Sequence, residues 1–155
     1  MEKRDWGFPE RIWGIEKEYD AGRIGYIYDA LKKLPHNFSL VDVACGEGII
    51  ADGIQYLFPE ARVSQFDIVS YQEWGHLRVK PYQMNVDDFM KRDEKYDVVM
   101  FLNSFRNWEE KERGTFIEWL KRNARYFITS GQDIGFAKET IGKDVKGYSL
   151  DMYTL

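Results

Sequence analysis

Hydrophobic residues in this chain form short runs that alternate with stretches in which they recur every three or four positions. The short runs predict buried strands at 38–44, 62–68, 82–86, 96–102, 125–129 and 148–154. The periodic stretches predict helices at 21–34, 49–58, 108–123 and 132–142, with a short helical turn at 87–91. Strands that alternate with helices indicate a mostly parallel sheet with helices on both faces. The pattern therefore predicts an α/β fold.

The chain shows no repeat, low-complexity tract or linker-like composition, so we expect one domain over residues 1–155. Its 155 residues, 44% of them hydrophobic, suffice for one filled core but not for two ordinary domains. Residues 1–18 mix charge with three large aromatic side chains and predict an irregular arm with a short helix. We expect residues 1–37 to form an N-terminal helical arm or lid, and residues 38–155 to form the core.

Composition narrows the function classes. A net charge of −4 makes nucleic acid an unexpected main partner, although a local basic patch would still be compatible with it. One cysteine excludes an intrachain disulfide framework and fits a reducing compartment. The N-terminus does not resemble a signal peptide, and no apolar run approaches the roughly 20 residues that span a bilayer. We expect a cytoplasmic protein without a membrane segment.

The most informative segment is residues 39–48, where an apolar run meets a turn with Gly46 and Gly48 and a helical pattern follows. A strand that turns sharply into a helix exposes unpaired backbone N–H groups that bind nucleotides and nucleoside cofactors. Gly46-x-Gly48-x-x-Ala51 fits the dinucleotide pattern, with Asp67 about 20 residues later as a ribose acceptor. The alternative is that Gly46 and Gly48 form a tight turn with a structural role and no ligand. Asp42, inside the strand, is unusual for a dinucleotide site because burying an acid is costly.

The arrangement Asp42-x-Ala44-x-Gly46-x-Gly48 resembles motif I of the class I S-adenosylmethionine-dependent methyltransferases. The resemblance implies a Rossmann-like three-layer sandwich and S-adenosylmethionine as cofactor. It implies that Gly46 and Gly48 face the methionine part and the ribose, with Ala44 in place of the commoner first glycine. It also implies that Asp42 contacts the amino-acid end of the cofactor, directly or through water. The alternative is that Asp42 is an acid at a sheet edge or a helix N-cap and binds no ligand.

The resemblance continues over residues 38–108. Asp67 stands where the family has the acid that accepts both ribose hydroxyls, and Ile68 would lie against the adenine. Asn85 stands where the family has an adenine-binding acid, and the Val86 N–H would donate to the ring. With a shifted register, Asp87 becomes the acceptor instead, and ordinary loop polarity is the alternative for this segment.

Residues 96–108 resemble the family's motif IV strand and the loop after it. Phe101, Leu102 and Asn103 would border the methyl-donor end, with plain core packing as the alternative for Phe101. Many relatives carry a His-His pair where this chain has Arg106-Asn107, so no catalytic base is assigned. The chain also lacks the Asn/Asp-Pro-Pro-Tyr/Phe signature of enzymes that methylate nucleobase amino groups.

The remaining candidate residues have ordinary interpretations. Cys45 has no paired base, and Glu47 is expected to be solvated. We expect His36 to be a surface turn residue. His76 is interpreted as an ordinary loop histidine, and a role as general base is its alternative. The aromatic side chains of Trp13, Tyr19, Tyr26 and Tyr28 are expected to pack in the core rather than to form a lid. No cluster of His, Cys, Asp or Glu has metal-ligand spacing.

We therefore expect S-adenosylmethionine-dependent methyl transfer, with a small molecule slightly favoured as acceptor. The alternative is a degenerate cofactor-binding domain that regulates or scaffolds a partner protein. A dinucleotide oxidoreductase is disfavoured because no second catalytic domain is available.

The predicted C-terminal part is short. Relatives follow the fifth strand with a helix and an antiparallel strand pair, whereas only about two dozen residues remain here. We expect a truncated C-terminal part. Either a large acceptor or a partner subunit, such as a second copy in a homodimer, would then complete the pocket.

Overall fold

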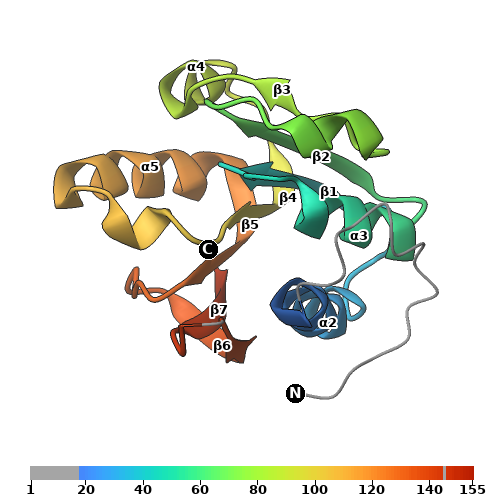
Figure 1. Ribbon diagram of the computed structural model, residues 1–155. Helices are drawn as coiled ribbons and strands as arrows, with labels where there is room; N and C mark the ends of the chain where they lie inside the picture. The colour runs from blue at the N-terminus through green and yellow to red at the C-terminus, as the bar shows by residue number, and fades with distance from the viewer. Residues whose placement is uncertain (1–17, 145) are drawn as a thin grey trace.

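The computed structural model describes residues 18–144 and 146–155, and their strands form one seven-stranded sheet in the order β3-β2-β1-β4-β5-β7-β6 (Figure 1). The strands are β1 (Ser39–Val43), β2 (Arg62–Asp67), β3 (Tyr82–Gln83), β4 (Tyr96–Phe101), β5 (Ala124–Ser130), β6 (Ala137–Lys143) and β7 (Ser149–Thr154). The strands β3, β2, β1, β4 and β5 pair in parallel, and β7 runs antiparallel between β5 and β6. The strand order reverses between β1 and β4, which is where ligands bind in open sheets of this kind.

Helices cover both faces of the sheet, as the alternating pattern predicts (Figure 1). The α-helices are α2 (Glu18–Leu31), α3 (Ile49–Leu57), α4 (Val86–Lys91) and α5 (Glu110–Asn123), and the short 3-10 helices are η1 (Gln72–His76) and η2 (Phe105–Asn107). One face carries α2 and α3, and the other carries α4 and α5. The observed layers confirm the predicted Rossmann-like sandwich.

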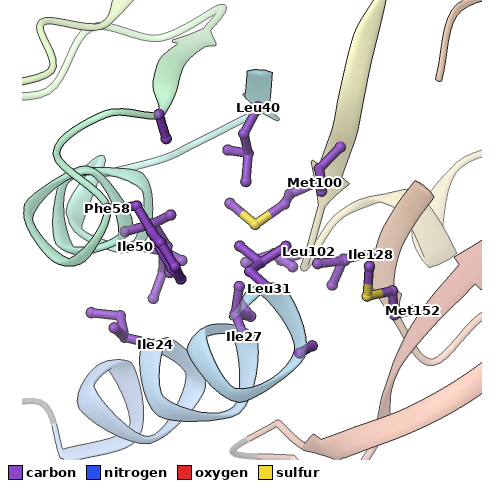
Figure 2. Close-up of a cluster of buried hydrophobic side chains, with 14 of the residues drawn as sticks. Ile24, Ile27, Leu31, Leu40, Ile50, Phe58, Met100, Leu102, Ile128 and Met152 are labelled. Carbon is purple, nitrogen blue, oxygen red and sulfur yellow. The ribbon is translucent and has the colours of Figure 1, made fainter. Parts of the chain in front are cut away.

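The face under α2 and α3 is filled mainly by aliphatic side chains (Figure 2). Ile24, Ile27 and Leu31 lie one helical turn apart on α2 and are buried against Leu40 of β1 and Met100 of β4. Burying one such side chain contributes about 1.5–3 kcal/mol, so this stripe fixes α2 onto the sheet. Helix α2 is therefore part of the core in the residues that the structure describes.

The opposite face is aromatic. Phe66, Phe89, Phe101, Phe116 and Phe127 are all buried in one cluster with the indole ring of α5. Their ring centroids lie about 4.5–5.9 Å apart in tilted, stacked and edge-on pairs, which are the arrangements that aromatic quadrupoles favour. The high aromatic content of the chain is thus used to hold α4 and α5 on the sheet.

The prediction of a helix at 132–142 is wrong. The chain instead forms a loop with Gly131 and Gly135 at positive φ, followed by β6, which pairs with β7 through backbone hydrogen bonds. Strand β6 is an edge strand with mostly exposed side chains, so its sequence shows no alternation of buried and exposed positions. Ile134 and Phe136 of the loop pack against the aromatic cluster. The antiparallel strand pair of the fold is therefore retained, and the helix before it is what this chain lacks.

Other boundaries differ less from the prediction. The predicted strand 82–86 ends at Gln83 because Asn85 caps α4, which begins at Val86. Tyr26 and Tyr28 are half-buried against the core, in agreement with the core interpretation. The predicted arm at residues 1–17, with Trp13, lies outside the described residues, as does the side chain of Tyr19. Within the described part of the chain, no helix has the length and apolarity to span a membrane.

Candidate functional site

A cavity of about 580 Å³ opens at the carboxyl ends of β1, β2 and β4. Its walls come from the turn after β1, the end of β2, the start of α4, and the segment that joins β4 to α5. The lining residues are Ala44, Gly46, Phe66, Asp67, Ile68, Tyr71, Met84, Asn85, Val86, Asp87, Phe101, Asn103, Ser104, Trp108 and Glu112. Most of the predicted cofactor residues therefore meet in one cavity, although the chain separates them by up to 59 positions (Ala44 to Asn103).

The turn after β1 has three residues in the left-handed region, with φ of 56° at Ala44, 60° at Gly46 and 83° at Gly48. A Cβ atom on Gly46 would meet nothing within 4 Å, which leaves the turn backbone open toward the cavity. A Cβ atom on Gly48 would lie 2.5 Å from Cδ1 of Leu77. Gly46 thus permits close approach of a ligand, whereas Gly48 permits close packing of the loop after η1.

Asp67 lies at the end of β2 and is largely buried. Its Oδ2 accepts a hydrogen bond from the backbone N–H of Gly46 at 2.8 Å, and its Oδ1 accepts one from the N–H of Val69 at 3.1 Å. The indole N–H of Trp74 donates to the carbonyl of Gly46 at 2.8 Å, so the turn is held from both sides. Each carboxylate oxygen keeps a further lone pair, and Asp67 remains able to accept from a ligand.

Asp42 is 3% exposed and does not line the cavity. Its side chain shares the sheet face of Leu40, under α2 and α3, because side chains alternate along β1. Burial raises the pKa of Asp42 to about 7, against the attraction of the Arg23 guanidinium and with a smaller increase from Asp67. The two carboxylates are therefore close enough to interact electrostatically, but only Asp67 faces the cavity.

At the start of α4, the side chain of Asn85 has a structural role that the sequence analysis did not predict. The side-chain oxygen of Asn85 accepts from the backbone N–H of Asp88 at 2.8 Å and caps α4. Asn85, Val86 and Asp87 all line the cavity, so both registers considered for this segment remain open. Ile68 is 63% exposed on the cavity wall, where it presents an apolar surface.

At the end of β4, Phe101 and Asn103 line the cavity, whereas Leu102 is buried on the face under α2. Phe101 is completely buried in the aromatic cluster and forms the cavity floor from within the core. The side chain of Asn103 accepts a hydrogen bond from Nη1 of Arg23 on α2 at 2.8 Å. This bond connects α2 to the site.

Comparisons with solved structures agree with this architecture. The methyltransferase domain of bacterial CtHen1-CN is 15% identical, with a TM-score of 0.63 over 88% of this chain and 100% of that chain. WbdD, solved with the kinase inhibitor LY294002, is 12% identical, with a TM-score of 0.62 over 90% of this chain. The plantazolicin methyltransferase BpumL, solved with a desmethylPZN analogue and SAH, is 20% identical, with a TM-score of 0.50 over 79% of this chain.

The matched chains differ greatly in length. This chain spans 41% of the WbdD chain and 49% of the BpumL chain. No protein-family model and no curated protein sequence matches it.

The decisive observation is that these neighbours match 79–90% of this chain with TM-scores of 0.50–0.63. The chain has the class I methyltransferase fold.

Several residues that the sequence analysis considered as candidates lie away from the cavity. His76 is exposed and does not line the cavity, and His36 is a surface residue packed on Phe58. Burial raises the pKa of the Cys45 thiol far above its usual range, which opposes a nucleophilic role. The described residues contain no group of His, Cys, Asp or Glu able to hold a metal ion.

Six lining residues were not selected by sequence analysis: Phe66 in β2, Met84 after β3, and Tyr71, Ser104, Trp108 and Glu112. The last four follow the ends of β2 and β4, and position after a parallel strand was the signal that could have identified them. Glu112 joins Asp67 and Asp87, so the lining carries three carboxylates. No lysine, arginine or histidine lines it among the residues that the structure describes.

Proposed function

We propose that this protein binds S-adenosylmethionine in the cavity and transfers its methyl group to an acceptor. The observation that carries the proposal is Asp67. It lies at the end of β2 on the cavity wall and is oriented by the N–H groups of Gly46 and Val69, with acceptor capacity left for a ribose diol. The uncrowded backbone of Gly46 provides room for a ligand beside it.

The other lining residues fit the rest of this cofactor. Ile68 offers an apolar surface to the adenine, and the polar groups of residues 85–87 are available to its amino group and ring. When bound, S-adenosylmethionine supplies a methyl group that the positively charged sulfur makes electrophilic. The protein then needs only to hold the donor and the acceptor in line, and such positioning lowers a barrier by up to roughly 7–11 kcal/mol.

The charge of the cavity favours this cofactor over a dinucleotide. Asp67, Asp87 and Glu112 line the cavity, and no basic side chain of the described residues lines it. Carboxylates attract a sulfonium and an ammonium group but repel a pyrophosphate. A dinucleotide would have to bring two negative charges beside these acids, which supports the methyltransferase assignment over an oxidoreductase.

A non-catalytic cofactor-binding domain is the second candidate. Arg106 stands where many relatives have a histidine, and its guanidinium is bonded to Ser130 and Asp144 instead of facing the cavity. The chain would then keep the residues that bind the cofactor but would not catalyse methyl transfer. A domain of this kind would act by contact with a partner protein.

The acceptor is proposed to be a small molecule, in keeping with the net charge of −4 and the absence of the nucleobase signature. A second copy or a partner subunit is proposed to complete the acceptor side, because the helix between β5 and β6 is missing.

Titration calorimetry tests the cofactor assignment. We expect S-adenosylmethionine and S-adenosylhomocysteine to bind with Kd below about 1 mM, and NADH not to bind. Asp67→Asn should weaken the cofactor at least tenfold, about 1.4 kcal/mol, while keeping an oxygen for the turn. Asp88→Asn, an exposed acid of α4 that does not line the cavity, is the matched control and should change Kd less than about twofold. Equal losses in both variants would refute the role of Asp67.

Turnover is tested separately with methyl-labelled S-adenosylmethionine and fractionated cell extract. Label transferred to an acceptor by the wild type, and reduced in Asp67→Asn at cofactor concentrations below the Kd of that variant, supports an enzyme. Cofactor binding without transfer to any fraction favours the non-catalytic domain, and no cofactor binding at all refutes both candidates.

A further inference from the structure

Beside the cavity, at the carboxyl ends of β4 and β5, a second group of side chains is not explained by cofactor binding. Arg106 follows the cavity residue Asn103 by three positions and donates to Oγ of Ser130 at 2.9 Å. Ser130 Oγ in turn donates to the carbonyl of Leu102, next to Asn103, at 2.6 Å. This group therefore lies next to the cavity residue Asn103, on the side of β5.

The guanidinium of Arg106 is fixed in position. Its side chain is 10% exposed, and Nη1 lies 3.4 Å from Oδ2 of Asp144, whose side chain is 4% exposed. The other oxygen of Asp144 accepts from the backbone N–H groups of Lys146 and Tyr148, each at 2.9 Å. One carboxylate thus connects Arg106 to the backbone that carries Tyr148.

The ring of Tyr148 is held against Arg106. The guanidinium carbon lies 4.2 Å from the ring centroid, as in a cation–π contact. Gly131, with φ of 70°, leaves the space that this stack needs, because a Cβ atom there would lie 2.9 Å from both side chains. Arg106, Gly131 and Tyr148 come from three separate parts of the chain and together fix one ring.

This ring is nevertheless 45% exposed, whereas Tyr153 on β7, the strand that begins directly after Tyr148, is fully buried. A tyrosine that served only to fill the core would be covered, since ordering it otherwise gains little apolar burial. A fixed aromatic ring with exposed surface matches a stacking platform, on which a planar π-system lies at low entropic cost.

We propose that Tyr148, oriented by Arg106, is the acceptor-binding surface of this protein and selects a planar aromatic acceptor. The inference rests on the proposed function, because it names the substrate class of the same site. Arg106 is then a positioning residue for the ring, which accounts for its replacement of a histidine without requiring it to move a proton.

The test compares 2-naphthol with decahydro-2-naphthol, two neutral alcohols with the same carbon skeleton, of which only the first is planar. The protein is labelled with 3-fluorotyrosine, and the fluorine resonance of Tyr148 is assigned from Tyr148→Phe. Each alcohol is titrated with and without S-adenosylhomocysteine. Tyr56 is the internal control, since it is 37% exposed and has the Arg78 guanidinium 4.6 Å from its ring, but lies on α3 and not at the carboxyl ends of β4 and β5.

We expect 2-naphthol to shift the Tyr148 resonance saturably, with an affinity at least threefold higher than that of the saturated alcohol, and to leave Tyr56 unchanged. Tyr148→Leu, followed by ligand-observed NMR, should weaken 2-naphthol three- to tenfold, whereas Tyr148→Phe should retain its affinity within twofold. Neither change should alter the Kd of S-adenosylhomocysteine.

Equal affinities for the two alcohols, equal shifts at Tyr56 and Tyr148, or no shift at Tyr148 would each overturn the inference. If Tyr148→Leu does not fold, the comparison of Tyr148 with Tyr56 in the wild type decides. Failure of S-adenosylhomocysteine to bind would count against the proposed function. A bound cofactor analogue without discrimination between the alcohols would count against the planar acceptor alone.

Discussion

Asp42→Asn should make the unliganded protein more stable near neutral pH while weakening its cofactor binding. Burial raises the pKa of Asp42 to about 7 in the folded protein, well above the usual range of an aspartate. The folded state therefore holds this proton more tightly than the unfolded state, and stability is lost as the pH rises toward 7. This difference in pKa between the folded and unfolded states corresponds to a loss of at most about 4 kcal/mol of stability above neutral pH.

Asparagine resembles the protonated carboxyl and removes this loss. The free energy of unfolding of Asp42→Asn should exceed that of the wild type by an amount that grows by about 2–3 kcal/mol between about pH 5 and pH 8. Chemical unfolding followed by tryptophan fluorescence measures this difference. Glu118→Gln, an exposed acid on α5, is the control and should show a difference that is nearly independent of pH.

The affinity for the cofactor should depend on pH in the opposite direction to the stability of the unliganded protein. Asp42 does not line the cavity, but a cationic ligand bound there still favours its ionised carboxylate through space, so binding of S-adenosylmethionine should release a proton near pH 7 and strengthen as the pH rises. Calorimetry in buffers of different ionisation enthalpy measures the released proton, which Asp42→Asn should abolish. A stability difference that stays constant across this pH range would refute the assignment of a titrating Asp42.

Three further changes test the turn and its support. Ala44→Gly should stabilise the protein by up to about 1 kcal/mol in thermal unfolding, since only glycine adopts a φ of 56° without strain; a loss of stability would contradict the left-handed turn. Gly48→Ala should cost about 2 kcal/mol or more because its Cβ meets Leu77 at a φ of 83°, whereas Gly114→Ala, in open space on α5, should not destabilise. Asp52→Ala should cost about 2–3 kcal/mol in urea unfolding, because its buried Oδ1 accepts two backbone N–H groups of the loop after η1; an unchanged midpoint would exclude this role.

The sequence by itself determined the elements that carry their own signal. β1, β4 and α3 are local patterns of apolar residues, and their boundaries are within one or two residues of the prediction. Because parallel strands end at one edge of a sheet, Asp67 and Asn103 could be expected to meet before any coordinates were known. The positive φ at Ala44 likewise agrees with the place where relatives prefer glycine.

Only the tertiary structure decided the features that depend on distant neighbours. Strand β6 forms because β7 supplies its hydrogen bonds, and its own exposed side chains carry no strand pattern. Trp74 reaches the carbonyl of Gly46 across 28 positions, and Arg23 reaches Asn103 across 80. Local sequence records the preferences of the backbone and the period of burial. Contacts between separate elements depend on how the layers pack, which no window of the sequence contains.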